Sequence, residues 1–561
     1  MKTWNLGNTT VRNPERIRDA LRVFKDQFEG KAFDKPTQNE FFTALIIAGV
    51  IKGDPTQEGS KDWSARKWAS AFNKLGLALP RGTQENRVVT ITDAGNALLS
   101  DDAIESDVFL RQMLKIQLPS PTEDDLDGAS IHPFYLVLSV AYGLLERNLR
   151  PLGKEEIALF IQSATSDNQT EEIIQNINQY RQQRDAIEGR IGKRKFFLEQ
   201  LSLKAQELYG DDNSPQKMGT LQDYSDTTVR YSSITGIFTI GRQSLVIKED
   251  QVNLAKAIIE AGAPALLNEG DFWTTFHNPV LPALPTDNSG FLQNDISSLE
   301  RRLSELSQQT GSGVEGRNEV DGSNVLALKR RREDLEQELI ALKEILFYRS
   351  QSTPEQVEDI KSLFESIMNR ETIGGSDYRP AWAEWGVWRV FLAINTIASP
   401  ISETRGFKIN SELYPVHHAK GGAADLCFKY DDNVIIPAEI TLSANERQFN
   451  MEGEAVKFHV KSIMENNQSS EVISVFTAPD VHVATAHEFY KAEFYSQKLN
   501  GVVKLNIVPL TFEQLQSLLP GQRNECKSGS DLQSKLRSLI QLKETVEDGS
   551  VWLQKISTAL A

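Results

Sequence analysis

Three carboxylates in the C-terminal third of the chain stand in otherwise apolar surroundings. Glu384 is one of two charged residues between Trp382 and Ile394. Asp425 opens a short apolar run, and Glu439 interrupts a longer one. A carboxylate in such surroundings is costly unless it is paired or binds a cation. Carboxylate oxygens suit Mg²⁺, which can orient a water molecule and stabilise charge on a phosphodiester. The three acids therefore predict a Mg²⁺-dependent centre for phosphodiester hydrolysis.

The apolar pattern also predicts the elements that position these acids. Residues 382–394 predict a helix that is buried on nearly every side. Residues 421–428 predict a turn that enters a strand at Asp425, and residues 434–442 predict a second strand around Glu439. Two strands joined by a short polar turn predict a β-hairpin that presents both acids. The spacing alone, 439 − 425 = 14 positions, leaves open a pair of surface acids, and the apolar neighbours of Glu439 favour the site.

This arrangement resembles the PD-(D/E)XK nuclease core. The whole chain resembles the AlwI-like family of type IIS restriction endonucleases, which includes strand-specific nicking relatives. The segments that carry the resemblance are Asp107–Gln112, Thr228–Tyr231, Thr235–Phe238, Ala383–Trp385, Pro415–Ala419 and the acidic pair. The resemblance implies that Glu384, Asp425 and Glu439 are catalytic acids that bind the metal, and that Glu452 is a fourth active-site acid.

One position departs from the nuclease motif. Thr441 stands where a lysine usually lies, two positions after the second acid. An ammonium group at that place positions the attacking water or stabilises developing charge. Residues of a predicted helix can approach the site instead, and these are Glu452, Lys457, His459 and Lys461. Of these, we expect Glu452 with a second metal ion to fill the role.

Two neighbouring features give no support to other chemistry. His417 and His418 are adjacent on an extended segment and point to opposite sides, so we expect a DNA-contacting or structural histidine. Gly421 and Gly422 are not followed by Gly-Lys-Ser/Thr, so they do not predict a phosphate loop. ATP dependence is therefore not indicated.

Composition limits the class of protein. With 561 residues the chain exceeds a single hydrophobic core, which predicts about three or four domains. Its net charge of −16 argues against coating nucleic acid through bulk electrostatics, although a local basic face is compatible with specific binding. Neither a signal segment nor a membrane-spanning stretch is predicted, so we expect a cytoplasmic protein. Cys427 and Cys526 predict ordinary buried thiols.

The N-terminal part predicts a module that reads DNA. Residues 38–52 and 63–75 have apolar positions at helical spacing, and an alternating run at 88–92 and a short helix at 97–99 follow. This order is typical of a winged helix-turn-helix. An excess of basic residues favours phosphate contacts, with a solvated helix face as the alternative. The candidate DNA contacts are Arg66, Lys67, Lys74, Arg81 and Arg87.

A second module of this kind is predicted further along the chain. A long charged helical stretch at 171–208 leads to a strand at 228–231 and a hairpin at 237–247, which again indicate a wing. Arg230 and Arg242 are its candidate DNA contacts. Leucines at heptad-like spacing then predict a helical hairpin that acts as a spacer, with a dimerising coiled coil as the alternative.

These patterns together predict a multidomain α+β protein. Two mainly helical winged-helix modules, 1–130 and 131–278, are followed by a helical spacer, 279–372, and an α/β nuclease domain of the PD-(D/E)XK kind, 373–561. By the resemblance, the protein binds a short asymmetric duplex site and, with Mg²⁺, cuts a few base pairs to one side. A strand-specific nicking enzyme and a non-catalytic winged-helix regulator are the alternatives. Double-stranded DNA and a cognate DNA methyltransferase are the implied partners, and we expect a monomer whose cleavage domains dimerise transiently on DNA.

Overall fold

The chain forms two compact units. The computed structural model describes residues 2–51, 62–81, 88–121, 126, 128–211, 214–241, 244–311, 322–370, 373, 379–419, 422–430 and 433–561. Unit 1 comprises Met1–Leu299 and Asn318–Asp334, and unit 2 comprises Glu300–Arg317 and Leu335–Ala561. Both predicted DNA-reading modules thus fall in unit 1, and the predicted spacer is divided between the units. None of the helices in the described ranges has the length and apolar character that crossing a bilayer demands.

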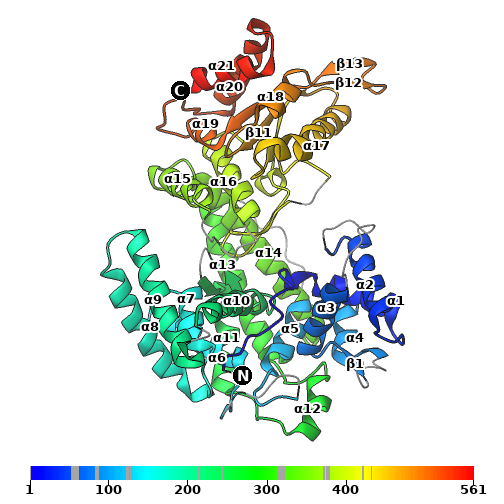
Figure 1. Cartoon of the computed structure of the whole chain (residues 1–561), viewed down its shortest axis with the longest axis vertical. Helices are drawn as coiled ribbons and strands as arrows, with labels where there is room; N and C mark the ends of the chain where they lie inside the picture. The colour runs from blue at the N-terminus through cyan, green and yellow to red at the C-terminus, as the bar shows by residue number, and fades with distance from the viewer. Residues whose placement is uncertain are drawn as a thin grey trace. The chain divides into compact units, whose positions relative to one another are not determined.

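The first part of unit 1 has the predicted order of helix, helix, hairpin and short helix (Figure 1). Its elements are α1 (Ile17–Phe28), α2 (Lys35–Ile47), α3 (Asp62–Lys74), β1 (Ala78–Arg81), β2 (Val88–Ile91), α4 (Asp93–Leu99) and α5 (Glu105–Leu114). Strands β1 and β2 pair antiparallel. The rings of Phe24 and Phe41 have their centroids 4.6 Å apart, and Phe72 from α3 completes this buried cluster. Aromatic packing therefore joins the first three helices.

The second part of unit 1 is mainly helical and contains a small three-stranded sheet. Its elements are α6 (Pro133–Glu146), β3 (Leu152–Gly153), α7 (Lys154–Glu156), the π-helix Ile157–Ile161, α8 (Thr170–Asp185), α9 (Arg190–Tyr209), α10 (Ser214–Ser233), β4 (Phe238–Ile240), β5 (Ser244–Ile247), α11 (Val252–Ala261) and α12 (Glu269–Phe276). The predicted hairpin is confirmed, because β4 and β5 pair antiparallel. The helical stretch predicted at 171–208 is confirmed and forms two helices. Gly189 between them has a φ of 72°, a conformation that glycine adopts readily.

The strand predicted at residues 228–231 is wrong, because this segment lies inside α10. Val229 and Tyr231 are fully buried there, and Arg230 forms an ion pair of 2.8 Å with Asp226 one helical turn earlier. The segment contains Thr and Val, β-branched residues that favour strands where no tertiary contact opposes that preference. Burial and the i,i+4 ion pair decide for the helix, since local preference is weaker than tertiary packing.

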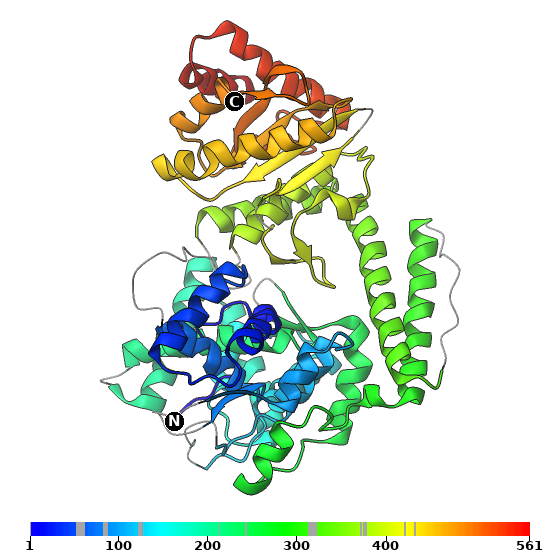
Figure 2. The same cartoon turned by 90° about the vertical axis from the view of Figure 1, so that its right-hand side faces the viewer.

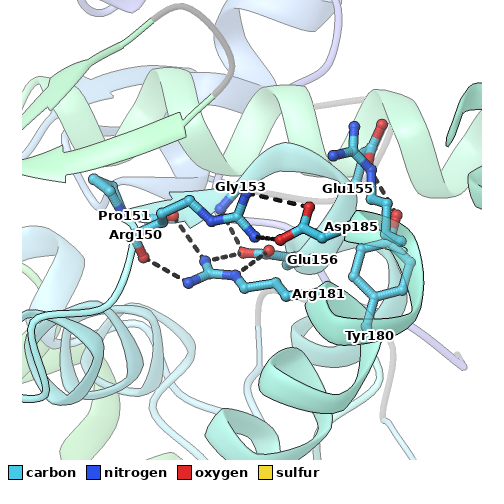
Figure 3. A network of polar contacts seen from close by, with 9 residues as sticks. Arg150, Pro151, Gly153, Glu155, Glu156, Tyr180, Arg181 and Asp185 are labelled. Atoms are coloured by element: carbon cyan, nitrogen blue, oxygen red, sulfur yellow. Dashed lines mark hydrogen bonds and ion pairs between the residues drawn. The ribbon is translucent and has the colours of Figure 1, made fainter. Parts of the chain in front are cut away.

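A buried polar network holds α7 and α8 together (Figure 3). The guanidinium of Arg181 on α8 lies 2.6 and 2.7 Å from the two carboxylate oxygens of Glu156. It also donates to the carbonyl oxygens of Arg150 and Pro151 at 2.8 and 2.9 Å. Nearby, Arg150 pairs with Asp185 on the surface. The Arg181 side chain is thus fully engaged within the protein.

Two long helices, α13 (Ser289–Thr310) and α14 (Val325–Ser350), lie side by side (Figure 2) and confirm the predicted helical pair. They do not form a unit of their own. In unit 1, Arg332 of α14 pairs with Asp295 of α13 at 2.6 Å. In unit 2, Arg349 of α14 donates to the carbonyl oxygen of Thr310 at the end of α13 at 2.8 Å. Each helix is therefore anchored to its partner within each unit.

Unit 2 is built on a mixed sheet with strand order β10-β9-β11-β14, to which β8 is added on β9. Strands β8 (Leu426–Lys429) and β9 (Val434–Ile440) form the predicted antiparallel hairpin. Strands β10 (Glu471–Val472) and β11 (Ser474–Ala478) each pair in parallel with β9, and β14 (Ile507–Thr511) pairs in parallel with β11. Parallel strands covered on both faces are buried along their length, as β11 and most of β14 are. The remaining elements of unit 2 are α15 (Pro354–Met368), α16 (Arg379–Ala393), β6 (Lys408–Ile409), β7 (Pro415–His417), α17 (Asn445–Asn466), α18 (Val483–Tyr490), β12 (Glu493–Ser496), β13 (Gly501–Lys504), α19 (Phe512–Gln516), α20 (Gly529–Gln541) and α21 (Gly549–Leu560).

Candidate active site

The hairpin of β8 and β9 brings Asp425 and Glu439 together. Asp425 directly precedes β8, and Leu426 is in register with Ala438, the residue before Glu439. The main-chain N–H of Ile440 donates to Asp425 Oδ2 at 2.8 Å. Glu439 is 6% exposed and is in register with Phe476 of β11, so it lies within the sheet. The prediction that both acids flank one point of a hairpin is confirmed.

Burial and mutual repulsion shape the electrostatics of this pair. Burial, followed by the charge of Glu439, raises the pKa of Asp425 to about 7, against the hydrogen bond from Ile440. Burial also raises the pKa of Glu439, and the hydrogen bond from His459 opposes that shift. Two carboxylates that disfavour each other's ionisation attract a cation, because a cation relieves the repulsion. Perturbed acids of this kind are typical of functional sites.

The helix that follows the hairpin, α17, supplies two more groups, and Figure 2 shows it in gold beside the yellow strands. His459 Nδ1 lies 2.8 Å from Glu439 Oε1, and both side chains are largely buried. This hydrogen bond raises the pKa of His459, which favours the imidazolium. The charge of Glu452 contributes to raising the pKa of both Asp425 and Glu439, so Glu452 lies near the pair.

Glu384 lies on α16 and is 5% exposed. Its Oε2 accepts a hydrogen bond of 2.7 Å from the main-chain N–H of Ala419. The carboxylate of Glu384 on α16 thus holds the main chain of the segment around Ala419. Gly406 lies between the Ala419 segment and Asp425. Its N–H donates to the carbonyl oxygen of Asp425 at 2.8 Å, and a Cβ added at Gly406 would lie 3.1 Å from the Cβ of Ala419.

The acidic pair fits a divalent cation only as part of a ligand set. Among the described residues, no three His, Cys, Asp or Glu side chains converge in a group that would hold a metal ion by itself. Mg²⁺ is usually bound by one or two carboxylates together with water and substrate phosphate, rather than by a complete protein cage. Asp425 and Glu439, which are adjacent, buried and mutually repelling, meet that requirement.

Thr441 stands at the position of the motif lysine, and the residues of α17 expected to approach it have different partners. Thr441 is buried, and its Oγ1 accepts from the N–H of Ser443 at 3.0 Å. Lys457 pairs with Glu454 and Glu488, while Lys461 lies over the ring of Phe494. Of the residues expected to approach the site, His459 is thus the one with a hydrogen bond to a predicted catalytic acid. The sequence analysis favoured Glu452 for this role, whereas the structure shows a hydrogen bond to Glu439 from His459.

The predicted DNA contacts have different environments. Arg66 is exposed and pairs with Asp62 at 3.2 Å, Lys67 lies over the Trp63 ring, and Lys74 donates to Asn5. Arg87, Arg242 and the side chain of Arg81 lie outside the described residues.

Arg230 is a correction. It is 3% exposed, and its guanidinium is held by Asp226 and by the carbonyl oxygen of Val11 at 2.9 Å. An arginine enclosed in this way supports the packing of α10 on the N-terminal segment. It does not present its charge to a DNA backbone in this conformation.

The chain thus combines a buried pair of acids on the mixed sheet of unit 2 with a mainly helical unit 1. The model of the AlwI restriction endonuclease family matches residues 73–518, which is more than half of the chain and includes all of the predicted acids. The chain belongs to this family. It is a restriction endonuclease, a hydrolase that binds and cuts DNA.

Solved structures show weaker likeness. The small subunit R.BspD6I2 of the heterodimeric restriction endonuclease R.BspD6I is 20% identical, with a TM-score of 0.30 over 36% of this chain and 100% of that chain. The BpuJ1 endonuclease binding domain, solved with pyrene- and phenanthrene-modified DNA, is 15% identical, with a TM-score of 0.31 over 46% of this chain and 87% of that chain. A comparison with curated protein sequences gave no match.

Proposed function

We propose that this restriction endonuclease is of type IIS, and that it binds a short asymmetric duplex site and hydrolyses phosphodiester bonds a few base pairs to one side with Mg²⁺. The observation that carries the proposal is the division between the two units. The buried pair of Asp425 and Glu439 belongs to unit 2, whereas the helix-helix-hairpin-helix arrangement proposed to read DNA belongs to unit 1. Recognition and chemistry on different units explain a cut outside the recognised sequence. Cleavage within that sequence would instead need both functions at one place.

Each residue of the centre has a proposed role. Asp425 and Glu439 would hold Mg²⁺, which when bound activates water and stabilises charge on the phosphate. His459 would replace the motif lysine, because an imidazolium that donates from Nδ1 to Glu439 retains a positive Nε2–H group for the developing charge. Glu452 is proposed as a further acid of the site. Glu384 would orient the Ala419 loop through its carboxylate.

The decisive experiment uses a supercoiled plasmid that carries the recognised site, identified beforehand by mapping cut ends on genomic DNA. With Mg²⁺, linear product supports a double-strand cutter. Open circles that never progress identify the strand-specific nicking enzyme. Unbroken plasmid under conditions of full DNA binding would refute the proposal.

Variants test the site assignment in the same assay. We expect Asp425→Ala or Glu439→Ala to abolish cleavage and to leave sequence-specific binding in gel shifts within a few fold of wild type, because both acids belong to unit 2. Glu471→Gln is the matched control, since this acid lies on β10 of the same sheet and pairs with Arg537 on the surface. Normal cutting by both alanine variants would refute the assignment.

A further inference from the structure

A buried ion pair links α14 to the segment beside the acidic pair. Arg405 Nε lies 2.8 Å from Glu344 Oε1, and its Nη2 lies 3.2 Å from Oε2. The side chains of Arg405 and Glu344 are 14% and 3% exposed, respectively. Arg405 also donates to the carbonyl oxygen of Phe407 at 2.8 Å, which holds its own loop in shape. The guanidinium is therefore fixed on one side by a helix and on the other by its own main chain.

The loop that Arg405 holds is in direct contact with the main chain of Asp425. Arg405 forms an antiparallel bridge with Leu426, the first residue of β8. Gly406 donates its N–H to the carbonyl oxygen of Asp425 at 2.8 Å. A Cβ added at Gly406 would lie 3.0 Å from that oxygen and 3.1 Å from the Cβ of Ala419. The loop thus packs tightly against both Asp425 and the segment that Glu384 orients, and a displacement of Arg405 would move the catalytic carboxylate.

The partner helix has a second distinctive property. Residues 325–334 of α14 belong to unit 1, and residues 335–350 belong to unit 2. Within unit 1, Lys329 pairs with Asp107 at 2.5 Å and with Asp287 at 2.9 Å. Within unit 2, Glu344 of the same helix pairs with Arg405. Helix α14 therefore carries ion pairs within unit 1 at Lys329 and within unit 2 at Glu344.

A buried ion pair is a poor source of stability, because desolvation offsets most of the attraction and an apolar pair of similar volume is often as stable. What the ion pair does provide is defined geometry, because a bidentate contact between guanidinium and carboxylate fixes both the distance and the angle between them. Catalysis needs that kind of control, because reacting groups that are misplaced by about 1 Å lose on the order of 100-fold in rate.

We propose that Glu344 and Arg405 are positioning residues that set the main chain at Asp425 relative to α14. This proposal rests on the proposed catalytic role of Asp425. Neither residue needs to contact DNA or metal, because both act through Gly406 and the first residue of β8. Their loss should therefore affect the rate of the chemical step while DNA affinity is retained.

The test is a single-turnover cleavage assay on the full chain with a labelled duplex that contains the site. We expect Glu344→Gln and Arg405→Lys to lower the rate constant at least 10-fold and to raise the Mg²⁺ concentration for half-maximal rate several-fold. Gel-shift dissociation constants without Mg²⁺ should stay within twofold of wild type. The double variant Glu344→Met/Arg405→Met removes both charges, and it should melt within a few degrees of wild type yet cleave as slowly as the single variants.

The matched control is Arg332→Met/Asp295→Met, which removes an equally buried ion pair from the same helix in unit 1. It should cleave within threefold of wild type once DNA is saturated. Wild-type cleavage by the Glu344→Met/Arg405→Met protein would overturn the proposal, as would an equal loss of rate in the control. The variant Asp425→Asn separates the proposed function from the positioning role. Normal cutting by Asp425→Asn would refute the catalytic assignment of Asp425. An inactive Asp425→Asn together with a fully active Glu344→Met/Arg405→Met protein would refute the positioning role alone.

Discussion

Removal of the imidazole of His459 is the most direct test of how this chain works without the motif lysine. The side chains of His459 and Glu439 are 14% and 8% exposed, and they meet at 2.8 Å. A charge-assisted bond between groups so little exposed is stronger than one at the surface. Loss of one preorganised donor that stabilises developing charge typically lowers kcat by about 10²- to 10³-fold, or about 2.7–4 kcal/mol. We expect His459→Ala to fall in that range.

The assay is single-turnover cleavage of a labelled duplex at saturating Mg²⁺ and enzyme, with DNA binding measured separately by gel shift. His459→Lys supplies an ammonium and should recover part of the loss, which a purely structural histidine would not show. Lys461→Gln is the control, because this cation lies on the same helix but over the Phe494 ring. A rate for His459→Ala within threefold of wild type would refute the reasoning.

Three other predictions concern organisation and stability. A fragment of residues 1–334 should select its site in gel-shift competition, and residues 335–561 should show no sequence preference, because the predicted DNA-reading modules belong to unit 1; site-selective cutting by the second fragment would contradict this. If both strands are cut, free protein should sediment as a monomer, and a two-site plasmid should be linearised faster than a one-site plasmid because tethering raises the local concentration; strictly first-order, one-site cutting would exclude transient dimers. Arg181→Met should destabilise unit 1 by about 3–5 kcal/mol, since it leaves buried Glu156 without its partner, and a melting temperature within 1 °C of wild type would show that the network is dispensable.

Local pattern was sufficient for the elements that carry the predicted acids. The apolar stretch around Glu384 predicted the buried helix α16, and the alternation of apolar runs with a polar turn predicted β8 and β9. These features depend on neighbours in the sequence, because helix and strand periodicities are set within a few residues. The acids Asp425 and Glu439 were predictable for the same reason, since a short hairpin brings its two strands together.

Contacts between distant residues were not predictable in this way. Arg230 stands in a segment with strand preference, and only its pairing with Asp226 and Val11 shows that it is a buried helical residue. Among four candidates on α17 the sequence favoured Glu452, and only the structure shows that His459 forms a hydrogen bond to Glu439.

In unit 2 the sequence by itself determined the helix around Glu384, the two strands of the hairpin and which two acids share that hairpin. Only the tertiary structure decided that Glu344, 61 positions before Arg405, holds the loop under Asp425. The physical reason is that side-chain partners across such separations depend on how elements pack, and packing depends on the summed burial of the whole unit rather than on any local pattern.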